Sequence, residues 1–388
     1  MKSDSPLTNA ASSRAGEAEE ASVFGRVFAY GSLQFCGHME EFLVSRTKDL
    51  CVYIVQPRVG VHVNLVRRYR RGVLVREHPV RSSQNLLLYY LFWYVNHARE
   101  LMRFCSKREK TLVLGGHPVV FFGMGLFRLL LPLAFAYWVG DYFPSRHPVI
   151  RLYEWVKKAY QRRMDYVYYL TDAINREMND GVVVNTPRRR TVMWGLKPFP
   201  AVSVPPPTPF TLLFVGLLRP GQGLEQLFDF LVLNPDCHLS LIGVGQPDYV
   251  AALQSHVQES GLAERVFFPN RFYSEAELVE AARACHVGIA LYDTAEENFT
   301  HYADPGKVKA YAEMHLPVLM TRISDIVPYV ERFGSGEVIG GVEELKGALE
   351  RVRTDYPRYR EGVERFSEHF AFERYYGAAF VAWKECWK

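Results

Sequence analysis

The sequence predicts an α/β protein of two domains, each built on a mostly parallel sheet. From Arg26 onward, short apolar runs alternate with longer helical stretches, a pattern typical of strands joined by crossover helices. The alternation stops at Lys197–Phe210, which contains six prolines, and then resumes. The length of 388 residues also exceeds the usual size of one domain. Two βα series joined by a Pro-rich linker therefore predict two Rossmann-like domains that face each other across a cleft.

The first domain is expected to span residues 23–196. Residues 1–22 are small, polar and acidic and lack the basic start and apolar core of a signal peptide, so a disordered tail is expected there. Strands are expected at the short apolar runs, which are residues 26–30, 50–57, 72–79, 111–116, 133–138 and 166–170. Helices are expected at residues 37–46, 84–104, 122–131 and 150–163, with another beginning near Asp172.

The second domain is expected to span residues 211–365, after a linker at 197–210 whose prolines exclude a central strand. Its expected strands are residues 211–216, 238–243, 265–269, 288–292 and 316–321. Its expected helices are residues 249–261 and 275–284, with two more beginning at Leu224 and Lys307. The last segment, 366–388, is rich in aromatic residues, and it is expected to form one amphipathic helix that crosses back toward the first domain.

The most apolar stretch, Val119–Gly140, is long enough to span a bilayer. Arg128 and Pro132 lie inside it, and it divides into an expected helix followed by an expected strand. Because buried helix–strand units of α/β proteins have the same composition, we interpret this stretch as part of the first domain.

Charge is distributed unevenly along the chain. Residues 1–205 hold 29 Lys and Arg against 16 Asp and Glu, a net charge of +13, whereas the remainder carries −9. Clusters such as Arg67–Arg71 and Arg188–Arg190 accompany aromatic stretches, a combination that suits an anionic membrane surface. The alternative is solvated arginines over a core helix. No recognised nucleic-acid-binding motif accompanies the basic residues, so nucleic acid is not the expected partner.

The six cysteines are scattered, without a pair or cluster at metal-ligand spacing. This distribution favours a reducing, cytoplasmic setting. Together with the basic surface, it predicts a cytoplasmic protein attached peripherally to the inner face of the cell membrane.

Four blocks of the second half resemble, in order and spacing, the nucleotide-sugar-binding domain of GT-B glycosyltransferases, including the GT4-like superfamily. The blocks are FVGLLRPGQGLEQLFDF, LIGVGQPDYVAAL, RVFFPNRFYSEAELVEAARACHVGIALY and ADPGKVKAYAEMHLPVLMT. The regions around Asp141 and Lys307 also resemble the membrane-associated glucuronosyltransferase of xanthan synthesis. The resemblance implies a GT-B fold and a UDP- or GDP-linked sugar donor that reacts without a separate cofactor.

Glycines follow the first strand of the second domain, at positions 216, 221 and 223. Small residues there let backbone N–H groups and a helix N-terminus approach a diphosphate, although an ordinary strand–helix turn has the same composition. Gly243 and Gly245 are expected to open a second loop at the same edge, where they either contact the donor or only turn the chain.

Lys307 follows Asp304-Pro305-Gly306 at the expected start of a helix, where an ammonium can pair with phosphate oxygens. The alternative is a solvated first-turn lysine. The resemblance implies a phosphate contact, because PGK matches the PxK pattern of the family. Arg219 is the only cation of the first glycine loop.

Three aromatic residues are further donor-site candidates. Tyr292 closes an expected strand and either lies against the donor or packs in the core. Phe272 and Tyr273 follow another strand and are candidates to stack on the nucleotide base.

The chain departs from the family pattern at several donor-binding positions. The positions of the E-x7-E motif, whose second Glu holds the ribose, fall on Tyr302 and Ala310. The usual Arg and Lys of the first glycine loop fall on Leu217 and Gln222. The chain therefore belongs to a divergent branch or has lost activity.

Asp141 ends an expected strand of the first domain and is a candidate catalytic residue. Its carboxylate could take the acceptor hydroxyl proton in an inverting displacement, as inverting relatives with an Asp here imply, or it could form an ordinary loop hydrogen bond. His117 also follows a strand and could contact the sugar or act as the base. His38 is a weaker candidate, and a lone histidine is often structural.

We therefore hypothesise a hexosyl- or glucuronosyltransferase that acts on a lipid-linked or saccharide acceptor in surface polysaccharide synthesis. Metal independence is expected because the chain contains no DxD triplet. One alternative is a nucleotide-sugar epimerase, since epimerases share the two-domain arrangement. Another is a non-catalytic, transferase-like partner subunit, which the residues at positions 217, 222 and 310 suggest.

Overall fold

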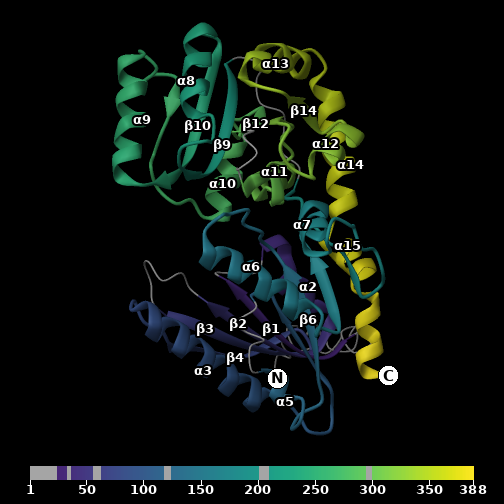
Figure 1. The fold of residues 1–388 in the computed structure, drawn as a ribbon. Coiled ribbons are helices and arrows are strands. Elements are labelled where there is room, and N and C mark those ends of the chain that lie inside the picture. The colour runs from purple at the N-terminus through teal and green to yellow at the C-terminus, as the bar shows by residue number, and fades with distance from the viewer. Residues whose placement is uncertain (1–23, 33–35, 56–62, 118–123, 201–208, 294–298) are drawn as a thin grey trace, which may run out of the picture. The chain divides into compact units, whose positions relative to one another are not determined.

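A computed structural model describes residues 24–32, 36–55, 63–117, 124–200, 209–293 and 299–388. The chain forms two compact units (Figure 1). One comprises the chain up to Met193 together with Phe372–Lys388, and the other comprises Trp194–Ala371. The expected disordered tail and residues 201–208 of the Pro-rich linker lie outside the described residues.

The first unit contains an eight-stranded sheet with the order β4-β3-β2-β1-β5-β6-β7-β8. The strands are β1 Phe24–Ser32, β2 Thr47–Val55, β3 Val63–Arg70, β4 Val73–Arg81, β5 Thr111–Gly115, β6 Leu133–Val139, β7 Tyr166–Tyr169 and β8 Arg189–Thr191. All neighbours pair in parallel except β2–β3 and β3–β4. All residues of β5, β6 and β7 are buried, as expected for central parallel strands with both faces covered.

The antiparallel hairpin of β3 and β4 was not expected from the sequence. The basic cluster Arg67–Arg71 forms the end of β3 and the first residue of its turn. Arg71 and Gly72 both adopt positive φ, at 47° and 77°, which suits a two-residue hairpin turn. The hairpin therefore extends the parallel sheet at one edge.

The helices of the first unit lie close to their expected positions. They are η1 Cys36–His38, α2 Met39–Arg46, α3 Leu86–Phe104, α5 Met124–Phe127, α6 Pro148–Gln161, α7 Asp172–Met178, α15 Phe372–Ala379 and η4 Val381–Trp387. The expected helix at 122–131 is short, because only Met124–Phe127 is helical in its described part. Among the described residues, no helix has both the length and the apolar character required to cross a bilayer.

The C-terminal segment consists of three pieces where one helix was expected. Helix α14, Tyr356–Phe370, ends at Ala371, whose φ and ψ of −52° and 111° are not helical, and α15 and η4 follow. Phe380 and Trp383 stack on each other at 4.2 Å between ring centroids. Phe380 also lies 4.8 Å from the Tyr168 ring of β7. The break places these rings against the first sheet.

Trp383→Ala is expected to destabilise the first unit by about 3–5 kcal/mol, because it empties a fully buried aromatic site. Differential scanning calorimetry should show a lower unfolding temperature. Trp155→Ala is the matched control, since that tryptophan is 65% exposed. Equal unfolding temperatures for the two variants would contradict the packing role of Trp383.

The second unit contains a six-stranded parallel sheet with the order β11-β10-β9-β12-β13-β14. The strands are β9 Phe210–Leu218, β10 Cys237–Gly245, β11 Val266–Phe267, β12 Val287–Ala290, β13 Val318–Thr321 and β14 Gly336–Ile339. The helices are α8 Leu224–Leu233, α9 Pro247–Glu259, α10 Glu275–Ala282, η2 Phe299–Tyr302, α11 Gly306–Glu313, α12 Val327–Phe333, η3 Val342–Glu344, α13 Leu345–Thr354 and α14. The order of the strands reverses between β9 and β12, and ligands of doubly wound sheets bind at the carboxyl ends of such strands.

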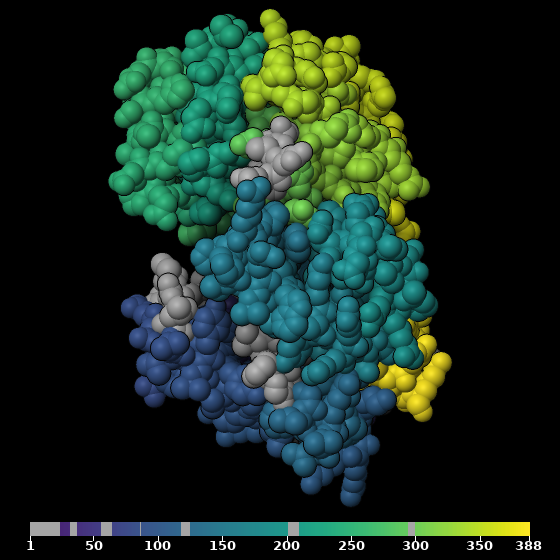
Figure 2. Space-filling model, viewed as in Figure 1, coloured from purple at the N-terminus to yellow at the C-terminus, as the bar shows by residue number. Residues whose placement is uncertain are grey.

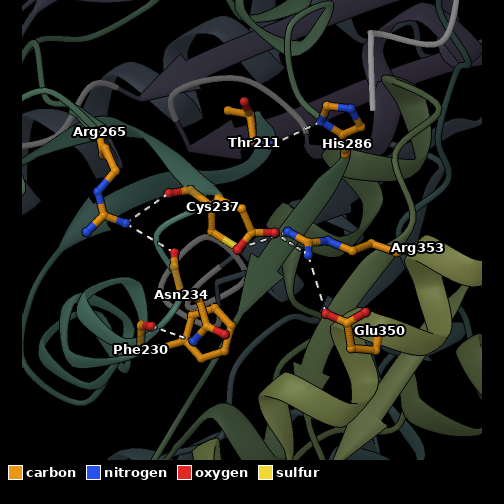
Figure 3. Close-up of polar contacts among 9 residues, drawn as sticks. Thr211, Phe230, Asn234, Cys237, Arg265, His286, Glu350 and Arg353 are labelled. Carbon is orange, nitrogen blue, oxygen red and sulfur yellow. Dashed lines mark hydrogen bonds and ion pairs between the residues drawn. The ribbon is translucent and has the colours of Figure 1, made fainter. Parts of the chain in front are cut away.

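Polar contacts close the opposite, amino edge of this sheet (Figure 3). Arg265 donates to three main-chain carbonyl groups between α8 and β10, at 2.7–3.4 Å. Arg353 forms an ion pair with Asp236 at 2.5 Å and lies 4.6 Å from the ring centroid of Phe210. These interactions satisfy local backbone and side-chain groups at the amino edge of the sheet.

Candidate functional site

The connection between β9 and α8 presents glycines at the carboxyl edge of the second sheet. Gly221 and Gly223 have φ of 78° and 67°, a region that only glycine adopts at little cost. Gly223 is also the N-cap of α8, where no side chain caps the helix. A Cβ at position 223 would lie 2.6 Å from the Cβ of Leu291, so glycine is required for packing as well. The connection thus leaves backbone N–H groups of the helix N-terminus open to an anion.

Gly216 lies inside β9 and not in the turn after it, with φ of 147°. A Cβ there would lie 3.7 Å from Cε and 3.8 Å from Nζ of Lys307. These are ordinary contact distances, so the positive φ and not a lack of space favours glycine at position 216.

Gly243 and Gly245 are the last residues of β10 and do not form the expected second loop. They pair with Gly216 and Leu218 of β9. A Cβ at position 243 would lie 1.9 Å from the carbonyl oxygen of Gly216, and one at position 245 would lie 2.4 Å from that of Leu218. Close approach of the two strands explains both glycines without a ligand.

Lys307 is the second residue of α11, and its Nζ points toward the glycine connection. Nζ donates a hydrogen bond to Oε1 of Gln222 at 2.5 Å. It also lies 4.0 Å from the ring centroid of Phe214 and 4.9 Å from that of Tyr292. Burial, together with the nearby charge of Arg219, lowers the pKa of Lys307 to about 7. Within the described part of the chain, Lys307 forms no ion pair with a carboxylate, so a bound anion could supply its counter-charge.

A cavity of about 310 Å³ lies at the strand-order reversal. Its walls come from the glycine connection, the end of β12 and the ends of β13 and β14, and they comprise Gly221, Gly223, Glu225, Gln226, Leu291, Tyr292, Asp293, Thr321, Gly340, Gly341 and Val342. The amide of Asp293 donates to the carbonyl of Gly221 at 3.0 Å and so joins two of these walls. The Thr321 hydroxyl accepts a hydrogen bond from the Tyr292 amide at 2.9 Å, which joins the ends of β12 and β13.

The remaining donor-site candidates lie at different places in the second unit. Arg219 follows β9, and its guanidinium lies 4.7 Å from the ring centroid of Phe299. Tyr292 is 7% exposed and forms part of the cavity wall. Phe272, 80% exposed, and Tyr273 lie between β11 and α10, and neither lines the cavity.

Helix α11 also carries a buried ion pair that the sequence did not reveal. Nζ of Lys309 lies 3.4 Å from Oδ2 of Asp304, and both residues are 4% exposed. The same carboxylate accepts from the Trp194 amide at 2.8 Å, and Lys309 donates to the Trp194 carbonyl. The charged side chains of Asp304 and Lys309 therefore hold the start of α11 to Trp194, and position 310 is an alanine.

In the first unit, Asp141 and His117 follow the adjacent parallel strands β6 and β5. The His117 ring lies 5.0 Å from that of Trp93 and 5.6 Å from that of Tyr153. Burial and the Lys157 charge lower the pKa of His117 to about 4, so the ring is neutral at neutral pH. Asp141 is open to solvent, yet partial desolvation raises the pKa of its carboxyl group, and Lys157 opposes that effect.

His38 lies elsewhere in this unit. It adopts φ of 59°, its ring stacks on Phe372 at 5.4 Å, and its Nδ1 lies 3.4 Å from Oε2 of Glu41. These contacts give His38 a structural role.

Two charged residues near Asp141 were not predicted from the sequence. Glu154 and Lys157 are one turn apart on α6, and both are buried. A Glu and a Lys three residues apart are usually a surface pair, so the sequence carries no signal of their burial.

The fold resembles solved glycosyltransferase structures over nearly the whole chain. No protein-family model and no curated protein matches the sequence. Sucrose-phosphate synthase from Thermosynechococcus elongatus aligns with a TM-score of 0.63 and 13% identity, over 93% of this chain and 98% of that chain. WaaG, a glycosyltransferase involved in lipopolysaccharide biosynthesis, aligns with a TM-score of 0.58 and 16% identity, over 93% and 99%.

Anabaena HepE in complex with UDP aligns with a TM-score of 0.60 and 14% identity, over 93% of this chain and 97% of that chain. At such identities the likeness establishes the fold. The prediction of a GT-B fold with two Rossmann-like domains is confirmed.

Proposed function

We propose that the protein is a glycosyltransferase that moves a sugar from a UDP- or GDP-linked donor to a lipid-linked or saccharide acceptor in surface polysaccharide synthesis. The observation that carries this proposal is the placement of Lys307 against the glycine connection at the strand-order reversal of the second sheet. A half-buried lysine and an open helix N-terminus together would form a site for a diphosphate.

The donor site would use residues of the second unit alone. Lys307, Arg219 and the amides near Gly221 and Gly223 would hold the diphosphate and stabilise the charge that develops on the leaving nucleotide. This arrangement supplies the positive charge that a metal ion supplies in other enzymes, so we propose metal-independent transfer of a hexosyl or glucuronosyl group. Two solved structures of the same fold support a uridine nucleotide, since one contains UDP and another, from E. coli, contains UDP-2-fluoro glucose.

The acceptor would react in the first unit, where Asp141 follows β6 and the neutral His117 follows the adjacent strand β5. The Asp141 carboxylate would remove the proton of the acceptor hydroxyl as the oxygen attacks the anomeric carbon. The nucleoside diphosphate would leave from the opposite face of the sugar, which gives inversion. The raised pKa of Asp141 makes its carboxylate a stronger base than a fully solvated aspartate.

Exposed apolar and basic side chains on the first unit support the proposal of a lipid-linked acceptor at a membrane surface. Three large apolar side chains of α6 are at least 60% exposed, namely Val149, Leu152 and Trp155. Further large apolar side chains are exposed on α3 and after α5, namely Leu87, Leu91, Val95, Leu129 and Leu130. Figure 2 shows the surface of α3 and α6, in blue, on the face turned toward the viewer. Exposed arginines accompany them at positions 151, 162 and 163, and cations beside apolar side chains match an anionic bilayer surface.

The double variant Leu152→Ala/Trp155→Ala is expected to bind vesicles of phosphatidylcholine and phosphatidylglycerol about tenfold more weakly, because it removes apolar area that enters the interface. Vesicle co-sedimentation measures this. Val232→Ala/Leu233→Ala is the matched control, since both residues are exposed on α8 of the second unit. Equal loss in the two variants would contradict the proposed surface and the peripheral location at the inner face of the cell membrane.

A thermal-shift panel of UDP, GDP and their sugars tests the donor site, because a ligand that binds only the folded state raises the unfolding temperature. Transfer of labelled sugar to a lipid-linked oligosaccharide, with and without EDTA, tests the reaction.

Conversion of the nucleotide sugar without an acceptor would favour an epimerase. The absence of any shift would favour a non-catalytic partner subunit, to which Gln222 and Ala310 at donor-contact positions also point.

A further inference from the structure

Helix α6 carries a buried ion pair next to the candidate base. Glu154 and Lys157 are 7% and 2% exposed. Nζ of Lys157 lies 2.9 Å from Oε2 and 3.1 Å from Oε1 of Glu154. Removing two charges from water costs several kcal/mol per ion, and their mutual attraction often only offsets that cost. Net stability is therefore a weak explanation for this pair.

Both members of the pair reach the loop that contains Asp141. Lys157 donates from Nζ to the main-chain carbonyl oxygen of Asp141. Glu154 accepts on Oε1 from the main-chain amide of Phe143 at 3.3 Å. The chain between the end of β6 at Val139 and the start of α6 at Pro148 forms no helix or strand of its own. The ion pair thus attaches this loop to α6 through one carbonyl and one amide group.

The positive charge of Lys157 also acts on the carboxyl group of Asp141. It favours the ionised form of Asp141, whereas desolvation favours the neutral form. The other titratable groups that interact with Asp141 are Tyr137 of β6 and Tyr153 and Glu154 of α6. Among these residues, Lys157 is the one that carries a positive charge.

We propose that Glu154 and Lys157 are positioning residues for Asp141, because they attach the loop that contains it to α6. The catalytic part of this inference rests on the proposed function. The attachment itself is a property of the fold.

Three variants separate attachment from charge. Lys157→Met removes the cation and both of its contacts. Lys157→Arg retains a cation. Glu154→Gln/Lys157→Met removes both charges, so it leaves no uncompensated buried charge if the single variant folds poorly. Lys48→Met on β2 is the control, because that lysine is exposed and distant in sequence from the loop.

Amide hydrogen exchange of peptides from residues 140–147 tests the attachment without any assay of activity. Exchange is expected to be faster by about tenfold in Lys157→Met and in the double variant, because the loop loses its connection to α6. It should remain at the wild-type rate in Lys48→Met. Wild-type exchange in both Lys157→Met and the double variant would overturn the inference.

The pH profile of sugar transfer tests the charge effect. In Lys157→Met, kcat should fall by about 10- to 100-fold, because a misplaced base reacts poorly. The acid limb should move to higher pH, because Asp141 loses the charge that favours its ionised form, and Lys157→Arg should restore it. KM for the donor should stay unchanged. An unmoved acid limb with unchanged kcat would overturn the catalytic part. If wild-type protein transfers no sugar, the proposed function fails, while hydrogen exchange still decides the attachment.

Discussion

Asp141→Asn is expected to reduce sugar transfer by about 100- to 10,000-fold, the usual contribution of a general base. The asparagine amide has nearly the same size as the carboxyl group, so the loop between β6 and α6 should keep its contacts to Glu154 and Lys157. An amide cannot take the acceptor proton. The effect should therefore fall on kcat, and the affinity for the donor should not change, because the donor candidates lie in the second unit.

Steady-state transfer kinetics and nucleotide thermal shifts measure the two quantities on the same protein sample. Asp180→Asn is the matched control, because the Asp180 side chain is 81% exposed, and it should retain wild-type kinetics. Full turnover by Asp141→Asn would exclude Asp141 as the base and would direct attention to His117.

Lys307→Ala is expected to weaken donor binding by about 10- to 100-fold, since a hydrogen bond to a charged group contributes about 1.5–3 kcal/mol. The substitution removes a half-buried ammonium that lies among Gln222, Phe214 and Tyr292. Isothermal titration calorimetry with the nucleotide selected by thermal shift measures the affinity. Lys346→Ala, an exposed lysine of α13 in the same unit, is the control and should bind normally.

The same lysine predicts a pH dependence of donor binding. Burial and Arg219 lower the pKa of Lys307 to about 7 in the free protein, and a bound diphosphate would raise it again. The complex then holds more protons than the free protein above pH 7. Affinity should consequently fall as the pH rises through and above 7, with proton uptake on binding. Lys307→Ala should lose this dependence. A wild-type affinity that stays constant between pH 7 and 9 would contradict a phosphate contact by Lys307.

Much of the fold follows from local patterns in the sequence. The strands from β5 to β7 and from β9 to β13 coincide with short apolar runs, since buried parallel strands expose neither face to water. The hairpin of β3 and β4 was not predicted. Strand β3 contains Asn64 and three arginines, and a strand near the edge of a sheet tolerates such residues. The break at Ala371 also escaped, because its cause is the packing of Phe380 and Trp383 on distant strands.

The donor-site candidates divide in the same way. Gly221 and Gly223 could be found from sequence, because positive φ at a helix N-terminus selects glycine locally. Gly243 and Gly245 look similar in sequence but serve the approach of β10 to β9. Gln222 was read only as a missing cation, yet it accepts the hydrogen bond of Lys307 from 85 residues away.

Residues near each other in the chain account for the alternation of strands and helices, the glycine connection and the position of Lys307 at a helix start. Which charges are buried depends on how distant segments pack. Lys157 and Glu154 lie beside Asp141, and Lys309 and Asp304 hold Trp194, only after strands and helices distant in sequence have packed. Desolvation, the largest cause of the pKa shifts of Lys307 and Asp141, is a property of that packing and cannot be read from neighbours in the chain.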